Sequence, residues 1–199
     1  SQCWAAVGLH PHEAKDANAA LPLLKLLAAQ PKVVAIGEIG LDYFYAHSTK
    51  EQQIAALHSQ IQLALECNLP ISFHVREAFD DFWPVFDSYQ NVRGVLHSFT
   101  DSPKNCEKAL ERGLLIGLNG IVTFTKNDWQ LQLAKELPLQ KILLETDAPY
   151  LTPRPVRGTI NEPANVRLVA EFLADFRNDS LQNIARHTTQ NANKLFGLG

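Results

Sequence analysis

Short apolar segments alternate with longer amphipathic segments along the chain. The short segments are often β-branched and not strictly alternating, which is typical of strands buried on both faces. They cover residues 4–8, 33–37, 71–74, 94–97, 114–117 and 142–145. The clearest helical pattern is 50–68, whose apolar face holds Ile54, Leu57, Ile61, Ala64 and Leu65. Strands that alternate with helices predict a parallel sheet with right-handed crossovers.

Local signals predict where several helices begin and end. Ser48 followed by Glu51 predicts a capping box before the helix at 50–68. Ser102-Pro103 predicts the start of another helix, and Gly113 its end. Further helices are expected at 19–29, 77–88, 127–136, 163–176, 181–188 and 191–196. The pattern as a whole predicts one α/β domain over residues 1–199, either doubly wound or part of a (β/α)₈ barrel.

Composition narrows the class of protein. The chain has 199 residues, 46% hydrophobic and 20% charged, with a net charge of −3, so it is not a generally basic protein that coats nucleic acid. No apolar run approaches the ~18 residues of a membrane span. The sequence contains no glycine-rich phosphate-binding motif, so a nucleotide cofactor is not predicted. Three separated cysteines predict reduced thiols in a cytoplasmic protein: Cys3, Cys67 and Cys106.

A histidine or a carboxylate follows five of the six predicted strands. These residues are His10, Glu38, His74, His97 and the pair Glu145 and Asp147. In parallel α/β folds the carboxyl ends of the strands carry function, and neighbouring strands lie about 4.8 Å apart. Taken one at a time, each histidine could equally be a structural residue whose ring nitrogens are hydrogen-bonded within the fold. As a set, they predict side chains that converge on a metal site.

The donor types indicate which metal and which chemistry. Imidazoles combined with carboxylates suit Zn, Mn, Fe or Co better than Ca, and Mg fits if carboxylates and phosphates dominate. One or two such ions activate water for hydrolysis. Glu38 can bridge two metals, and His74 and His97 are suited as neutral nitrogen ligands. The spacing does not choose between Glu145 and Asp147, of which Asp147 can also accept a proton from water.

Several motifs together resemble a known family. The chain reads GLHPH at 8–12, GEIGLD at 37–42, SFHVR at 72–76, HSF at 97–99 and ETDAPYL at 145–151, with Arg157-Gly158 and Asn161-Glu162-Pro163 further on. These motifs resemble the TatD family of metal-dependent deoxyribonucleases along the whole chain. The resemblance implies a (β/α)₈ TIM barrel of the metal-dependent hydrolase type with one or two metals. It also implies hydrolysis of DNA phosphodiester bonds, typically by trimming 3′ ends of single strands.

The resemblance implies a role for each matching residue. The metal ligands would be Glu38, His74, His97 and Asp147, with Asp147 and Glu38 also catalytic. Substrate would be bound by His10, His12, Arg76, Asn161 and Glu162, the last two on a loop at the mouth of the site. Before the resemblance is considered, Arg76 is equally suited to a salt bridge with Glu77 or Asp80.

One departure from the family pattern stands at the N-terminus. Family members usually start with a strand that carries His-x-His, whereas the only such pair here, His10 and His12, matches a later motif. Six strands instead of eight, and the absence of Met, predict an N-terminally truncated barrel domain. Two alternative functions stay open: a metal-dependent hydrolase of small esters, lactones or amides, and an inactive or partner-completed barrel fragment.

Overall fold

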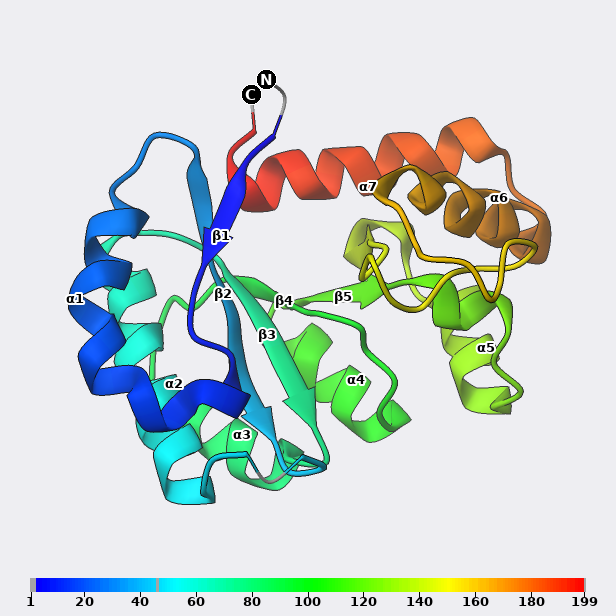
Figure 1. The fold of residues 1–199 in the computed structure, drawn as a ribbon. Helices are drawn as coiled ribbons and strands as arrows, with labels where there is room; N and C mark the ends of the chain where they lie inside the picture. The colour runs from blue at the N-terminus through cyan, green and yellow to red at the C-terminus, as the bar shows by residue number, and fades with distance from the viewer. Residues whose placement is uncertain (1–2, 46, 199) are drawn as a thin grey trace. The chain divides into compact units, whose positions relative to one another are not determined.

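The computed structural model describes residues 3–45 and 47–198. The chain divides into two compact units (Figure 1). The first unit runs to His97 and includes residues 195–197, and the second holds residues 98–194 and 198. Within the described residues, none of the helices is both long enough and apolar enough to span a membrane.

The first unit is a parallel sheet with helical connections. Its strands are β1 (Ala5–Val7), β2 (Val33–Asp42), β3 (Ile71–Arg76) and β4 (Gly94–Leu96), which pair in chain order. The short 3₁₀ helix η1 (Pro11–Asp16) and the helices α1 (Ala17–Ala28), α2 (Lys50–Glu66) and α3 (Phe79–Asp87) connect the strands. Helices α1 and α2 lie on the same side of these strands (Figure 1). The predicted alternation of parallel strands and helices is confirmed.

The core of this unit explains why its strands do not alternate in polarity. Strand β2 buries consecutive residues at 35–37 and 39–42, so both of its faces are covered. On β3, Phe73 is fully buried and meets Phe82 of α3 edge to face, with ring centroids 5.2 Å apart. Because these strands are buried on both faces, their sequences do not alternate between apolar and polar residues as those of half-exposed strands do.

The second unit contains two parallel strands, β5 (Leu115–Leu118) and β6 (Ile142–Leu144). Its α-helices are α4 (Pro103–Glu111), α5 (Asp128–Glu136), α6 (Val166–Arg177) and most of α7 (Leu181–Phe196). Short 3₁₀ segments are η2 (Gly120–Thr123), η3 (Leu139–Lys141) and η4 (Pro163–Asn165). The predicted limits of α4 are confirmed: the Ser102 hydroxyl caps its start, and Gly113 lies just beyond its end with φ 77°.

The predicted capping box of α2 is wrong by one residue. Thr49 is the N-cap, and its hydroxyl accepts from the Gln52 amide while the Gln52 side chain accepts from the Thr49 amide. Ser48 is buried instead, and its hydroxyl donates to the His12 carbonyl at 2.9 Å. Ser48 therefore ties the start of α2 to the loop after β1.

Two further helix predictions need correction. Leu65 is exposed, so the buried face of α2 is rotated from the expected one and includes Gln53 and Gln60. The predicted helices 181–188 and 191–196 form the single helix α7, because residues 189 and 190 (Thr and Gln) contain no helix-breaking side chain.

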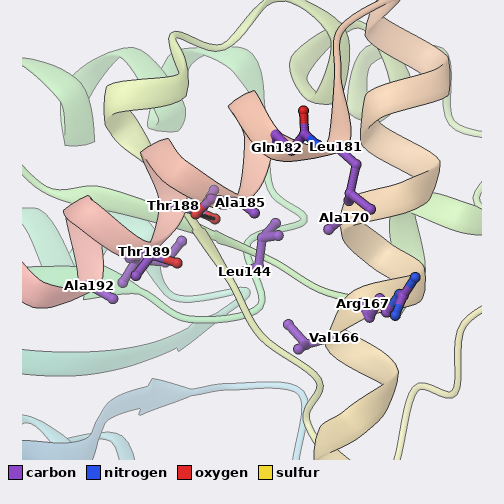
Figure 2. A pocket seen from close by; sticks show the side chains of 11 residues that line it. Leu144, Val166, Arg167, Ala170, Leu181, Gln182, Ala185, Thr188, Thr189 and Ala192 are labelled. Carbon is purple, nitrogen blue, oxygen red and sulfur yellow. Dashed lines mark hydrogen bonds between the residues drawn. The ribbon is translucent and has the colours of Figure 1, made fainter.

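An apolar groove of about 630 Å³ lies in the second unit between β6, α6 and α7. Ala170 of α6 and Leu181 and Ala185 of α7 line it (Figure 2). In the described part of the chain, no histidine, cysteine or carboxylate lines this groove. This groove is therefore not a candidate for metal binding or proton transfer.

The packing of α4 predicts the reactivity of one cysteine. Cys106 is 4% exposed, and burial raises the pKa of its thiol to about 11, with Glu107 adding to the effect. At pH 8 only about a thousandth of this thiol is ionised, so a disulfide reagent should not modify it in the folded protein. Titration with Ellman's reagent of a Cys3→Ser/Cys67→Ser variant, native and in guanidinium, measures this. Fast modification of the native variant would contradict the packing of α4.

Candidate metal centre

Glu38 lies within β2 rather than just after it. Gly37 pairs with Ser72 and Ile39 pairs with Phe73, so Glu38 is an extra residue between two registered positions. An extra residue of this kind is a β-bulge, which redirects a side chain and is common beside functional sites. The bulge accounts for a partly exposed carboxylate among neighbours that are buried, at 35–37 and 39–42.

Three histidines of the first unit face the Glu38 carboxylate. His97 Nε2 lies 3.6 Å from Oε1, and His74 Nδ1 and His10 Nε2 lie 3.8 and 4.0 Å from Oε2. The donor atoms of His10, Glu38 and His74 all lie within 4.8 Å of one another. Ligands bound at 2.0–2.2 Å from one ion are themselves about 3 to 4 Å apart. The spacing and the donor types therefore fit a divalent cation.

The buried carboxylate of Asp42 holds two imidazoles in place. Asp42 is the last residue of β2 and only 1% exposed. Its Oδ2 lies 2.9 Å from His74 Nε2 and 3.0 Å from His12 Nε2, and its Oδ1 accepts the amides of Phe44 and Tyr45. Burial raises the pKa of Asp42, but the Tyr45 amide and the two imidazoles outweigh it, so the pKa lies below its usual value. The group is therefore ionised at neutral pH.

These contacts assign different roles to His74 and His10. Because Nε2 of His74 faces a carboxylate, it carries the proton, and the lone pair of Nδ1 faces Glu38 and is available to a metal ion. Nδ1 of His10 instead accepts the His12 amide at 3.3 Å, so its Nε2 carries a proton. His10 therefore stands beside the centre rather than among its ligands, although its ring lies within 4.8 Å of the Glu38 and His74 donor atoms. Burial, with the nearby His74 and His12, lowers the pKa of His10 to about 4. His10 is a neutral donor suited to an anionic oxygen.

Two buried glutamines of α2 fix the backbone on which these groups stand. The Gln60 carboxamide accepts the Leu9 amide at 2.6 Å and donates to the Leu9 carbonyl at 3.1 Å. Gln53 pairs in the same way with the amide and carbonyl of Asp42, at 2.8 and 3.0 Å. Each carboxamide takes the place of a neighbouring strand, so α2 positions the residues next to His10 and to the metal centre.

Gly40 permits the close approach of β2 and β3 beneath the centre. It pairs with His74, and a Cβ atom at Gly40 would overlap the His74 carbonyl oxygen. Its φ of 154° is also one that larger residues rarely adopt. Glycine at this position lets the imidazole of His74 reach both carboxylates.

In the second unit, Glu145 and Asp147 have different environments. The Glu145 carboxylate accepts the Ser98 amide and lies against Gly117. Asp147 follows in a left-handed backbone conformation, with φ 60°. The contacts of Glu145 favour a structural role, which agrees with the family resemblance in leaving Asp147 as the ligand. The role of Asp147 stays a prediction.

The predicted substrate-binding residues fall into two groups. Arg76 ends β3 and is exposed, and His12 contacts Asp42, so both belong to the neighbourhood of the metal centre. Asn161 is 3% exposed, and its amide donates to the carbonyls of Thr146 and Tyr150. These bonds favour a role for Asn161 in supporting the loop after β6 rather than in contacting substrate at the mouth of the site. Glu162, in contrast, is exposed.

Asp42, Gln53 and Gln60 belong to the site but were not predicted from the sequence. A signal was present for Asp42, because it stands four residues after Glu38, an even spacing along one strand. The glutamines are seven residues apart on one face of a helix, at positions that interrupt an apolar stripe. Polar residues at such positions need buried partners.

Comparison with known proteins gives relatives along almost the whole chain. Residues 1–197 match the family described as TatD related DNase. The Bacillus subtilis protein named "Uncharacterized metal-dependent hydrolase YabD" is 40% identical over 198 residues, which cover 98% of this chain and 78% of that protein. The Citrobacter rodentium protein named "3'-5' ssDNA/RNA exonuclease TatD" is 37% identical over 204 residues, covering 98% of this chain and 78% of that protein.

A solved structure gives the fold. The crystal structure of YJJV, a TatD homolog from Escherichia coli K12, matches with a TM-score of 0.90 and 30% identity over 98% of this chain and 77% of that one. Together with the donor set, this defines a metal-dependent hydrolase with a TIM-barrel fold, as predicted. The chain belongs to the TatD-related DNase family. The prediction of a single, truncated domain stays a prediction.

The contacts of Asp42 predict the effect of removing its charge. In Asp42→Asn one acceptor oxygen replaces two, so His12, His74 and the two amides cannot all stay paired. We expect metal affinity to fall about 10- to 100-fold, the usual effect of losing a carboxylate behind a ligating histidine. Competition titration with a chelating dye measures it, and Asp80→Asn, exposed on α3, is the matched control. Unchanged affinity with an unchanged circular dichroism spectrum would show that Asp42 does not support the centre.

The roles of the histidines predict a difference between variants. His74→Ala and His97→Ala should each lose metal and activity together. His10→Ala should keep its metal while activity falls about 10²-fold, the scale of losing one positioned donor. Elemental analysis after dialysis, paired with rate measurements, tests this. A full metal complement in His74→Ala or His97→Ala would show that the removed imidazole is not a ligand.

Proposed function

We propose that this chain hydrolyses the phosphodiester bonds of single-stranded DNA from the 3′ end, with one or two divalent ions of Zn, Mn, Mg or Co. The observation that carries the proposal is the convergence of His10, His74 and His97 on Glu38. The proposal is supported by relatives named 3'-5' ssDNA/RNA exonuclease, 36–38% identical to the chain.

The proposed ligands are Glu38, His74, His97 and Asp147. A divalent metal at such a centre lowers the pKa of bound water and polarises the bond to be cleaved. Asp42 keeps His74 in the tautomer that presents Nδ1. Glu38, placed by the bulge in β2, and Asp147 supply carboxylates that accept the proton of the attacking water. His10 donates from Nε2 to a phosphate oxygen.

Arg76 supplies the positive charge that the chain as a whole lacks. A salt bridge of Arg76 with Glu77 or Asp80 was the alternative that the sequence allowed. Among the described residues, its guanidinium forms neither of these ion pairs. An unpaired guanidinium close to the metal centre is suited to bidentate contact with a phosphate. His12, held by Asp42, orients the segment that carries His10. We propose that Glu162 also contacts substrate.

The test uses oligonucleotides labelled at the 5′ end, single-stranded and duplex, with each metal in turn. We expect stepwise shortening of the single strand from its 3′ end and complete loss of activity in EDTA. Glu38→Gln should slow cleavage at least 10²-fold, since it removes both a ligand and a proton acceptor. Glu111→Gln, exposed on α4, is the matched control.

Two results would overturn the proposal. Single strands that stay intact with every metal would show that DNA is not the substrate. Faster turnover of small esters, lactones or amides in the same preparation would identify the alternative hydrolase. A cleaved strand shortened from its 5′ end would contradict the polarity alone.

A further inference from the structure

Two exposed aromatic side chains stand beside the candidate metal centre. Phe44 and Tyr45 lie one residue beyond the end of β2 and are 50% and 43% exposed. Single exposed apolar side chains are common, but these two are adjacent, with ring centroids 4.7 Å apart. Neither ring contributes to the core, so their exposure calls for another explanation.

A cation completes this aromatic surface. The guanidinium carbon of Arg76 lies 3.8 Å from the centre of the Phe44 ring and 5.0 Å from that of Tyr45. The backbone brings these residues together, because Asp42 pairs with Arg76 and the Tyr43 amide donates to the Arg76 carbonyl. Aromatic faces combined with arginine are the groups with which proteins bind unpaired bases and their phosphates.

The aromatic pair is tied to the metal centre by one residue. The amides of Phe44 and Tyr45 both donate to Asp42 Oδ1 at 3.0 Å, while Oδ2 of the same carboxylate contacts His74 and His12. The Tyr45 ring meets the His12 ring edge to face at 5.4 Å. The rings are therefore fixed relative to the ligands before substrate binds, which reduces the entropy lost on binding.

We infer that Phe44, Tyr45 and Arg76 form a stacking platform for a nucleobase next to the scissile phosphodiester. The inference rests on the proposed function and adds the basis of its preference for single strands. Bases in a duplex are already stacked and paired, so only an unpaired base offers a free face to the rings. Arg76 contacts a phosphate oxygen of the same strand.

The test removes the base and the rings separately. Wild-type chain is compared with Phe44→Ala/Tyr45→Ala on a single-stranded oligonucleotide and on one with an abasic residue at its 3′ end. We expect KM to rise about 10-fold when either the base or the rings are lost, with little further rise when both are lost. Changes in kcat should be smaller, because the platform binds substrate without touching the reacting atoms.

Two variants serve as controls. Tyr45→Phe keeps the ring and should have the KM of the wild type. If the hydroxyl of Tyr45 were the important group, this variant would instead have the raised KM of the double variant. Leu26→Ala removes a side chain that is 67% exposed on α1 and should behave as wild type. A circular dichroism spectrum identical to wild type shows that the double variant is folded.

A readout without catalysis separates this inference from the proposed function. An oligonucleotide with 2-aminopurine at its 3′ end is added to metal-free protein, where stacking on the rings quenches its fluorescence. Quenching by wild type that the double variant loses supports the platform. Cleavage by wild type with a KM that neither the base nor the rings affect overturns the platform and leaves the proposed function standing. Absence of both quenching and cleavage overturns both.

Discussion

The burial of one carboxylate organises the first unit of this protein. A charged oxygen pair removed from water must be fully hydrogen-bonded, and Asp42 satisfies this with two imidazoles and two backbone amides. One oxygen of Asp42 contacts His74 and His12, and the other accepts the amides of Phe44 and Tyr45. Asp42 therefore positions both the imidazoles of the candidate metal centre and the exposed rings. The candidate metal centre and the exposed rings therefore share one structural support.

The precision of this arrangement comes from α2 rather than from the loops themselves. Loops after strands are free to vary, and functional sites on them need a rigid support. Gln60 and Gln53 supply it by pairing with the backbone of Leu9 and Asp42. The cap at Thr49 starts the helix at the point where Ser48 is bonded to the loop of His12. Packing of α2 and geometry of the centre thus cannot change independently.

Much of the fold could be predicted from the sequence because its signals are local. Apolar β-branched runs predicted the six strands, and helical spacing predicted the helices between them. Because parallel strands end on one edge of the sheet, Glu38, His74 and His97 were expected to lie close together. The buried partners could not be predicted in this way. Gln60 and Leu9 are 51 positions apart, and nothing near either residue specifies the other. The bulge at Glu38 and the cap at Thr49 depend equally on contacts made only in the folded chain.

The carboxamide pairs of α2 also set how the site moves. Amides in surface loops usually exchange their hydrogens with water by small local openings, whereas those of regular structure wait for larger ones. The amides of Leu9 and Asp42 are bonded to glutamine side chains of a helix, so we expect them to exchange only when these contacts with α2 open. On this basis the segments around Leu9 and Asp42 open together with the packing of α2, and the geometry of the centre is as stable as that packing.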